Sequence, residues 1–265
     1  MAEWRTAICE TNGIRMHYTG TGVGKSPLIL LHGLTANGLC WTVIAHELEG
    51  EYDVIMPDFR GHGKSSAPDY GYRYDDHAND VVGLVNGLGI SPPILIGHSM
   101  GGLVAAVVAS HYPALIRGLI LADPTFISSK RQREVRDSDV ADQHRRVLNR
   151  SLEEVVEDLQ TRHPHRSLST VEIIARACLE TRMSAFDVLT PPNPEYSQLV
   201  GSIDVPSLLV IGDAGVVSPD LAAELQLVNP KFQVVQIKDA GHGIFYDQPD
   251  QFAAIVKSFL HSIDK

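Results

Sequence analysis

The sequence predicts a doubly wound α/β fold, in which a mostly parallel sheet is covered by helices and interrupted by a helical insertion. Three observations predict it. Apolar runs without polar alternation recur along the chain, helical patterns separate several of them, and a polar helical stretch breaks this rhythm near the middle. Strands that are buried on both faces of a parallel sheet have such continuous apolar runs. At 265 residues the chain can form one such domain.

Short Val, Ile and Leu runs bounded by turn residues indicate the strands. The expected strands are residues 26–33, 52–58, 92–99, 117–123, 206–213 and 232–242. Apolar positions at steps of three and four residues indicate the helices between and after them. The expected helices are residues 74–88, 99–111, 220–228 and 249–262. Right-handed crossovers then give a doubly wound sheet.

The stretch 125–203 does not follow the strand and helix alternation. It is rich in charged residues and carries helical patterns such as "SLEEVVEDLQ" and "TVEIIARACLETRM". We therefore expect a core made of residues 1–124 and 204–265, with 125–203 as a helical cap. Because the insertion follows a strand end, it should cover the carboxyl edge of the sheet, where open α/β sheets bind ligands.

Composition restricts the partners. A formal charge of −10 argues against a nucleic-acid surface and favours a small-molecule partner. The three cysteines are far apart, so they suggest neither a disulfide framework nor a Cys-x-x-Cys metal or redox site. The N-terminus lacks a signal-peptide pattern, and no apolar run is long enough for a membrane span. We expect a cytoplasmic protein that needs no membrane, no metal and no cofactor. The sequence does not predict an oligomeric state.

The motif "GHSMGG", residues 97–102, lies between an expected strand and an expected helix. A Gly-x-Ser-x-Gly sequence in this setting forms a tight strand-to-helix turn, and its glycines leave room for the serine hydroxyl to be exposed. Ser99 is therefore the candidate nucleophile. The N–H group of Met100, the residue after it, is expected to donate to the oxyanion that forms when the nucleophile attacks.

Several ordered motifs together resemble the α/β-hydrolase fold family, in particular its small esterases, perhydrolases, lactonases and carbon–carbon bond hydrolases. These motifs are "LLHGLTAN" at 30–37, "PDFRGHGKSS" at 57–66, "GHSMGG" at 97–102, "YPALIRGLILAD" at 112–123 and "DAGHGIF" at 239–245. The resemblance implies that Leu34 provides the second oxyanion N–H group. It also implies that His242, between two glycines after the last strand, is the base.

The acid that should orient His242 is not where the resemblance places it. In that family a strand like "PSLLVIGD" ends with Gly-x-x-Asp, but here Gly212 is followed three residues later by Gly215 in place of the aspartate. The favoured replacement is Asp123, which ends the strand next to that of the nucleophile, as in haloalkane dehalogenases of similar fold. The alternative is Asp213. Asp220 follows Ser218-Pro219 and is better explained as a helix N-terminal residue.

The expected activity is hydrolysis of a carboxylic ester or lactone of a small apolar substrate through an acyl-enzyme. One alternative is carbon–carbon bond hydrolysis of ring-cleavage products, with Arg176 or Arg182 binding a substrate carboxylate. Another is a hydrolase-derived receptor for a small molecule. An apolar pocket beneath the cap is also expected. Its candidate lining residues are Trp41, Phe126, Met183, Phe186 and Phe245.

Overall fold

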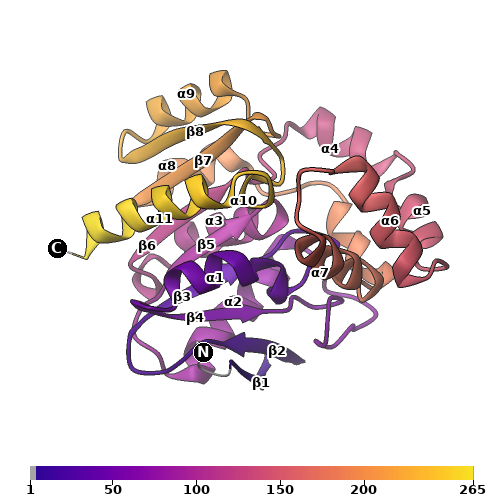
Figure 1. Ribbon diagram of the computed structural model, residues 1–265. Coiled ribbons are helices and arrows are strands. Elements are labelled where there is room, and N and C mark those ends of the chain that lie inside the picture. The colour runs from indigo at the N-terminus through magenta and orange to yellow at the C-terminus, as the bar shows by residue number, and fades with distance from the viewer. Residues whose placement is uncertain (1–3, 265) are drawn as a thin grey trace.

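A single eight-stranded sheet lies between two layers of helices in the computed structural model, which describes residues 4–264 (Figure 1). The strand order is β1-β2-β4-β3-β5-β6-β7-β8. Strands β1 and β2 pair antiparallel with each other and β2 with β4, while all other pairs are parallel. The strands are β1 (Arg5–Thr11), β2 (Ile14–Gly20), β3 (Ser26–Leu31), β4 (Tyr52–Pro57), β5 (Ile94–His98), β6 (Gly118–Ala122), β7 (Ser207–Ala214) and β8 (Phe232–Gly241). The predicted α/β fold class is confirmed.

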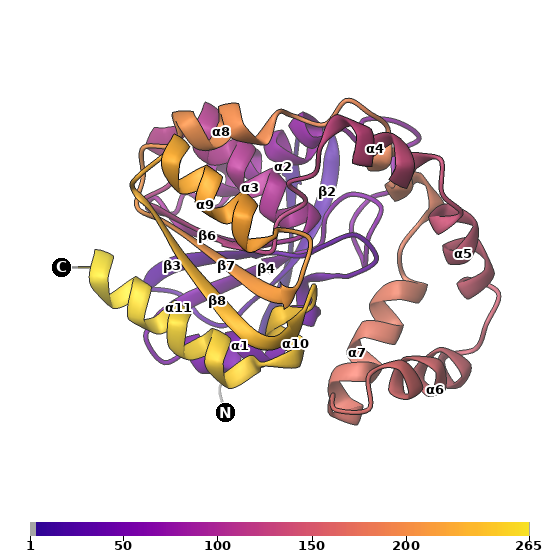
Figure 2. The same ribbon diagram turned by 90° about the horizontal axis from the view of Figure 1, so that it is seen from above.

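Helices cover both faces of this sheet (Figure 2). On one face lie α2, α3, α8 and α9, and on the other lie α1 and α11 with the short α10. The helices are α1 (Thr42–Leu48), α2 (Tyr74–Leu88), α3 (Met100–His111), α4 (Ser129–Arg136), α5 (Val140–Val147), α6 (Leu152–Arg162), α7 (Leu168–Leu179), α8 (Tyr196–Ser202), α9 (Pro219–Val228), α10 (Ile244–Asp247) and α11 (Pro249–Ile263). Three 3-10 helices complete the list: η1 (Gly38–Trp41), η2 (Pro113–Leu115) and η3 (Met183–Leu189).

The strands expected from apolar runs are all present, although the edge strand β8 buries only Phe232, Ile237 and Ala240. Every residue of β4, β5 and β6 is buried, as expected for strands with a helix layer on each side. The N-terminal hairpin of β1 and β2 gives a weaker signal. In the edge strand β1 only Cys9 and Thr11 are buried, and the polar Arg5, Thr6 and Glu10 break the apolar pattern.

Helices α4 to α7 follow one another along one side of the molecule between β6 and β7 (Figure 2). Helix α8 lies elsewhere: Leu199 and Val200 are buried in the same apolar cluster as α3 and α9. In the part of the chain that the structure describes, no helix is both long and apolar enough to cross a membrane.

Candidate active site

The turn that carries Ser99 joins β5 directly to α3. Ser99 has φ 53° and ψ −119°, a conformation that L-residues rarely adopt. The turn is possible because the helix backbone approaches the sheet very closely: a β-carbon on Gly101 would lie 2.4 Å from the carbonyl oxygen of Leu31. The strained turn therefore presents the Ser99 hydroxyl at the carboxyl edge of the sheet.

The imidazole of His242 bridges Ser99 and Asp123. His242 lies between β8 and α10, and its Nε2 is 2.8 Å from Ser99 Oγ. Its Nδ1 is 2.5 Å from Asp123 Oδ2. An ionised carboxylate can only accept hydrogen bonds, so Nδ1 carries the proton and Nε2 is left free to accept the serine proton. This is the arrangement that a general base needs.

Asp123 follows the last residue of β6, in a left-handed conformation with φ 42°, and its side chain is completely buried. The N–H group of Val216 donates to Oδ2 at 2.7 Å, and that of Val217 donates to Oδ1 at 2.9 Å. Together with the His242 ring, these donors give the buried carboxylate three hydrogen bonds. A buried carboxylate that is satisfied in this way can hold an imidazole in one orientation.

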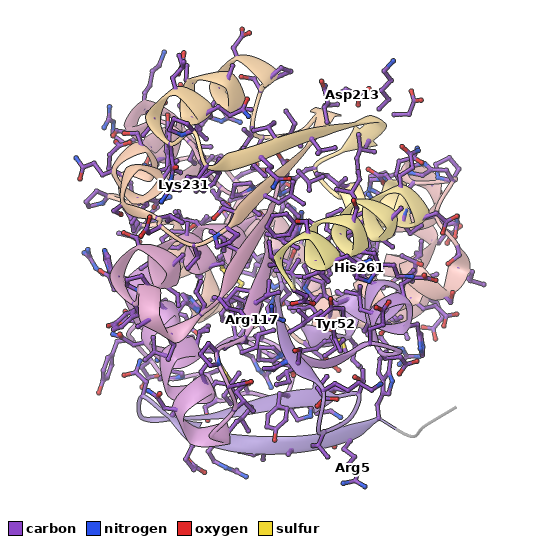
Figure 3. All side chains as sticks on the ribbon, turned by 90° about the vertical axis from the view of Figure 1, so that its left-hand side faces the viewer. Arg5, Tyr52, Arg117, Asp213, Lys231 and His261 are labelled. Carbon is purple, nitrogen blue, oxygen red and sulfur yellow. The ribbon has the colours of Figure 1, made fainter. Side chains whose placement is uncertain are left out.

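The alternative acid, Asp213, binds other groups. Its two oxygens accept from the N–H groups of Asp239 and Ala240, at 2.9 and 3.1 Å, and these hydrogen bonds lower its pKa. Its side chain lies at the periphery, at the tip of the β7–β8 pair (Figure 3). Asp213 thus links the end of β7 to the end of β8. Asp220 lies in the first turn of α9, which Ser218 caps by accepting from the Leu221 N–H group.

Two backbone N–H groups expected to form an oxyanion hole border the Ser99 turn. Met100 is the first residue of α3, so its N–H group has no partner within the helix. Among residues 4–264, no acceptor is found for the N–H groups of Met100 and Leu34. Leu34 is adjacent to Gly33, where a β-carbon would lie only 3.1 Å from Ser99 Cβ. Both donors are therefore near the hydroxyl and available.

Two polar residues near the site were not singled out by the sequence. Thr125 Oγ1 is 3.4 Å from Ser99 Oγ, and the Thr125 N–H group donates to the Ser99 carbonyl oxygen at 3.1 Å. Behind it lies Tyr74, whose pKa is raised by burial and partly lowered again by its hydrogen bond with Thr125. The only sequence signal for Thr125 was its position two residues after Asp123.

His98 contacts the base from the other side. Its Nε2 donates to the carbonyl oxygen of His242 at 2.8 Å, and the two rings lie 4.7 Å apart. Burial, with the neighbouring His242 as the next cause, lowers the pKa of His98 to about 3. His98 is thus a neutral donor that fixes the backbone of the base.

A cavity of about 380 Å³ opens beside Ser99. Its walls come from the ends of β5, β6 and β7 and from the inserted segment, α4 above all. The lining residues are Tyr74, Ser99, Thr125, Ile127, Arg131, Gln132, Val135, Leu189, Asn193, Gly215 and Val216. Four are aliphatic, namely Ile127, Val135, Leu189 and Val216, and Arg131 is the only charged residue in this lining.

The five aromatic and Met residues expected in the pocket do not appear in that lining. Trp41 is fully buried and stacks on Phe245 with ring centroids 4.0 Å apart. Phe126 stacks on Tyr196, and Phe186 stacks on His144. Met183 begins η3, and the arginines Arg176 and Arg182 also lie outside the lining. These aromatic side chains pack against other rings in the core rather than against the cavity.

One group of side chains in the described range could ligate a metal ion: His163, His165 and Asp247, with donor atoms within 4.8 Å of one another. The carboxylate of Asp247 is already bound by the guanidinium of Arg166, at 2.9 and 2.7 Å. This positive charge opposes a cation at the same oxygen, so the group is better explained as an ion-pair cluster.

Comparison with known proteins agrees with the sequence resemblance and the fold. A family model described as alpha/beta hydrolase fold matches residues 26–249. N-formylmaleamate deformylase of Pseudomonas putida is 30% identical over 267 residues, which cover 94% of each chain. The solved structure of E-2-(acetamidomethylene)succinate hydrolase superposes with a TM-score of 0.85 at 22% identity, covering 98% of this chain and 100% of that one. A malate-bound esterase of Thermogutta terrifontis superposes with a TM-score of 0.82 at 26% identity, covering 98% and 100%.

Proposed function

Since the chain belongs to the α/β-hydrolase fold family, we propose that it is a serine hydrolase that cleaves a carboxylic ester or lactone of a small substrate through an acyl-enzyme. The observation that supports this most directly is the bridging imidazole of His242, 2.8 Å from Ser99 Oγ and 2.5 Å from Asp123 Oδ2. In this proposal helices α4 to α7 act as a cap beside the reacting groups.

The first half of the reaction acylates Ser99. His242 Nε2 takes the hydroxyl proton as Ser99 Oγ attacks the substrate carbonyl carbon, and the buried Asp123 carboxylate stabilises the imidazolium that forms. The N–H groups of Leu34 and Met100 donate to the tetrahedral oxyanion. The imidazolium then returns its proton to the leaving alcohol as the carbon–oxygen bond breaks, leaving an acyl-serine.

The second half releases the acid. A water molecule takes the place of the alcohol, and His242 Nε2 removes its proton as the water attacks the acyl carbon. Collapse of the second tetrahedral intermediate breaks the bond to Ser99 Oγ, which recovers the proton from His242. The cavity beside Ser99, with Ile127, Val135, Leu189 and Val216 in its lining, would hold the acyl group.

A carbon–nitrogen bond is the second candidate target, because the deformylase relative is 30% identical over 94% of both chains. The same groups would act, with His242 protonating a leaving nitrogen instead of an oxygen. The two substrate classes therefore differ in the leaving group that the site accepts and not in the residues that react.

A fluorophosphonate probe and a panel of esters, lactones and N-formyl amides test the proposal. The wild-type protein should be labelled at Ser99 and should turn over p-nitrophenyl butyrate many times, whereas Ser99→Ala should do neither. Labelling that persists in Ser99→Ala would identify another nucleophile. A burst of one equivalent without further turnover would instead favour the receptor alternative.

A further inference from the structure

One charged side chain lines the cavity beside Ser99, among aliphatic and uncharged polar residues. Arg131 is the only charged residue in that lining, and it comes from α4, whose sequence SKRQREVR holds four cations and one acid. The chain as a whole has a formal charge of −10. A strongly basic helix beside the reacting serine of an acidic protein produces a local positive potential at the cavity.

From this arrangement, and resting on the function proposed above, we infer that the substrate carries a carboxylate on its acyl part and that Arg131 binds it. The apolar residues Ile127, Val135 and Val216 would contact the carbon chain between this carboxylate and the carbonyl that Ser99 attacks. The planar guanidinium can donate two parallel hydrogen bonds to a carboxylate, which fixes both its distance and its orientation.

Arg131 is free to make this contact. Its guanidinium lies 3.0 Å from Glu134 Oε2, but the side chain is 62% exposed and the pair is one helical turn apart on the surface. An exposed pair of this kind contributes little free energy, so a substrate carboxylate can replace Glu134 at small cost. The neighbouring Gln132 cannot move as easily. Its side chain is buried, donates to the Ile127 carbonyl oxygen at 3.2 Å and accepts from the Asn193 N–H group at 2.9 Å.

These contacts of Gln132 hold α4 against the cavity, so that the backbone of Arg131 has a fixed position beside it. Arg133 lies on the same helix but outside the cavity lining, and it is exposed. It provides a matched control, because Arg131→Gln and Arg133→Gln change the charge of α4 equally and differ only in their place relative to the cavity.

The test compares p-nitrophenyl monoesters of glutaric and adipic acid with the uncharged p-nitrophenyl esters of pentanoic and hexanoic acid. Arg131→Gln should lower kcat/KM for the acidic esters about tenfold to a hundredfold, the range for a hydrogen-bonded charge, and should lower it far less for the uncharged esters. Arg133→Gln should change both series by less than about threefold. Glu134→Gln should raise kcat/KM for the acidic esters, because it releases Arg131.

An equal loss for both series in Arg131→Gln, or equal effects of Arg131→Gln and Arg133→Gln, would overturn the inference. Calorimetric titration of Ser99→Ala with adipate and with uncharged adipamide tests recognition without turnover. If Ser99→Ala binds adipate but not adipamide, and the double variant Ser99→Ala with Arg131→Gln no longer binds adipate, the inference is supported even if neither ester series is hydrolysed. That failure of turnover would overturn the proposed function only.

Discussion

A β-carbon on Gly215 would lie 2.7 Å from both carboxylate oxygens of Asp123. Gly215, the position at which the sequence resemblance implied an aspartate, thus faces the space that the Asp123 carboxylate occupies. The two residues exclude each other, since any side chain at 215 would overlap the present position of Asp123.

Gly215→Ala should accordingly reduce kcat by an amount approaching that of losing the acid, because the methyl group displaces the Asp123 carboxylate from His242. Steady-state kinetics with p-nitrophenyl butyrate measures this effect, and circular dichroism checks the fold. The double variant Gly215→Asp with Asp123→Gly should recover part of the activity by returning a carboxylate to the same space. A fully active Gly215→Ala protein would show that this contact does not matter.

Asp123→Asn should lower kcat by several orders of magnitude, about 10⁴ in the best-studied triad, because the amide favours the wrong histidine tautomer. Asp213→Asn is the control, since Asp213 accepts only from backbone N–H groups at the strand tips. It should change kcat by less than about tenfold and lower the melting temperature slightly. If Asp213→Asn were the more damaging variant, the assignment of the acid would have to be reversed.

The ion pair between Arg166 and Asp247 should matter for the rate. Both side chains are 9% exposed, and Asp247 Oδ2 also accepts from the N–H group of Gly241, next to His242. Arg166→Ala removes the buried cation beside this carboxylate and leaves the largely exposed His165, with Nε2 3.0 Å from Oδ1, so the loop that carries the base should shift. We expect kcat to fall about tenfold to a hundredfold, the effect of a misplacement near 1 Å.

A suitable control for Arg166→Ala is Arg162→Ala, because Arg162 pairs with Asp158 on the exposed surface of α6. That variant should keep wild-type kcat and stability. Loss of kcat in Arg166→Ala with an unchanged KM would indicate misplacement of the base. A change in KM alone would instead mean that Arg166 acts on substrate binding.

Stability should fall with acid below about pH 6.5. Burial lowers the pKa of four deeply buried histidines: His32 to about 4, His62 and His98 to about 3, and His77 well below its usual value. In the unfolded chain these histidines take up protons below their ordinary pKa near 6.5, whereas in the folded protein they stay neutral. Their contribution to the free energy of unfolding is therefore fully present above pH 6.5 and is lost as the pH falls toward the folded-state pKa values. Each histidine adds up to about 1.4 kcal/mol per pH unit.

Chemical denaturation between pH 7 and pH 5 measures this slope. His77 is the informative variant, because neither ring nitrogen has a hydrogen-bond partner among the described residues and the ring packs against Phe59. His77→Phe should flatten the slope, whereas His111→Gln, at an exposed position, should leave it unchanged. An identical slope in His77→Phe and wild type would rule out this contribution.

The sequence predicted the parts of the site that depend on short-range patterns. The turn around Ser99 depends on its own glycines. Since position 215 is a glycine, the sequence indicated Asp123 as the acid. The structure brings these residues together with His242, and their catalytic roles stay predictions. The strands of the core were equally clear, because buried parallel strands have continuous apolar runs.

The cavity lining could not be predicted in the same way. It depends on how α4 folds back over the strand ends, which brings Arg131 and Asn193 close to Ser99 across long stretches of sequence. Aromatic side chains gave a misleading signal, because a large apolar ring can be buried equally well in the core, as Trp41 is against Phe245.

The position of the carboxylate on β6 also changes what the end of β7 can do. Its loop supplies two N–H groups to Asp123 through the main chain, which any amino acid except proline provides. Meanwhile the Val216 side chain faces the cavity. In the proposed mechanism no reacting atom belongs to the Val216 side chain, so substitution of Val216 can alter substrate preference while its N–H group still holds Asp123. An acid that is held by main-chain groups thus leaves this side chain open to selection for new ligands.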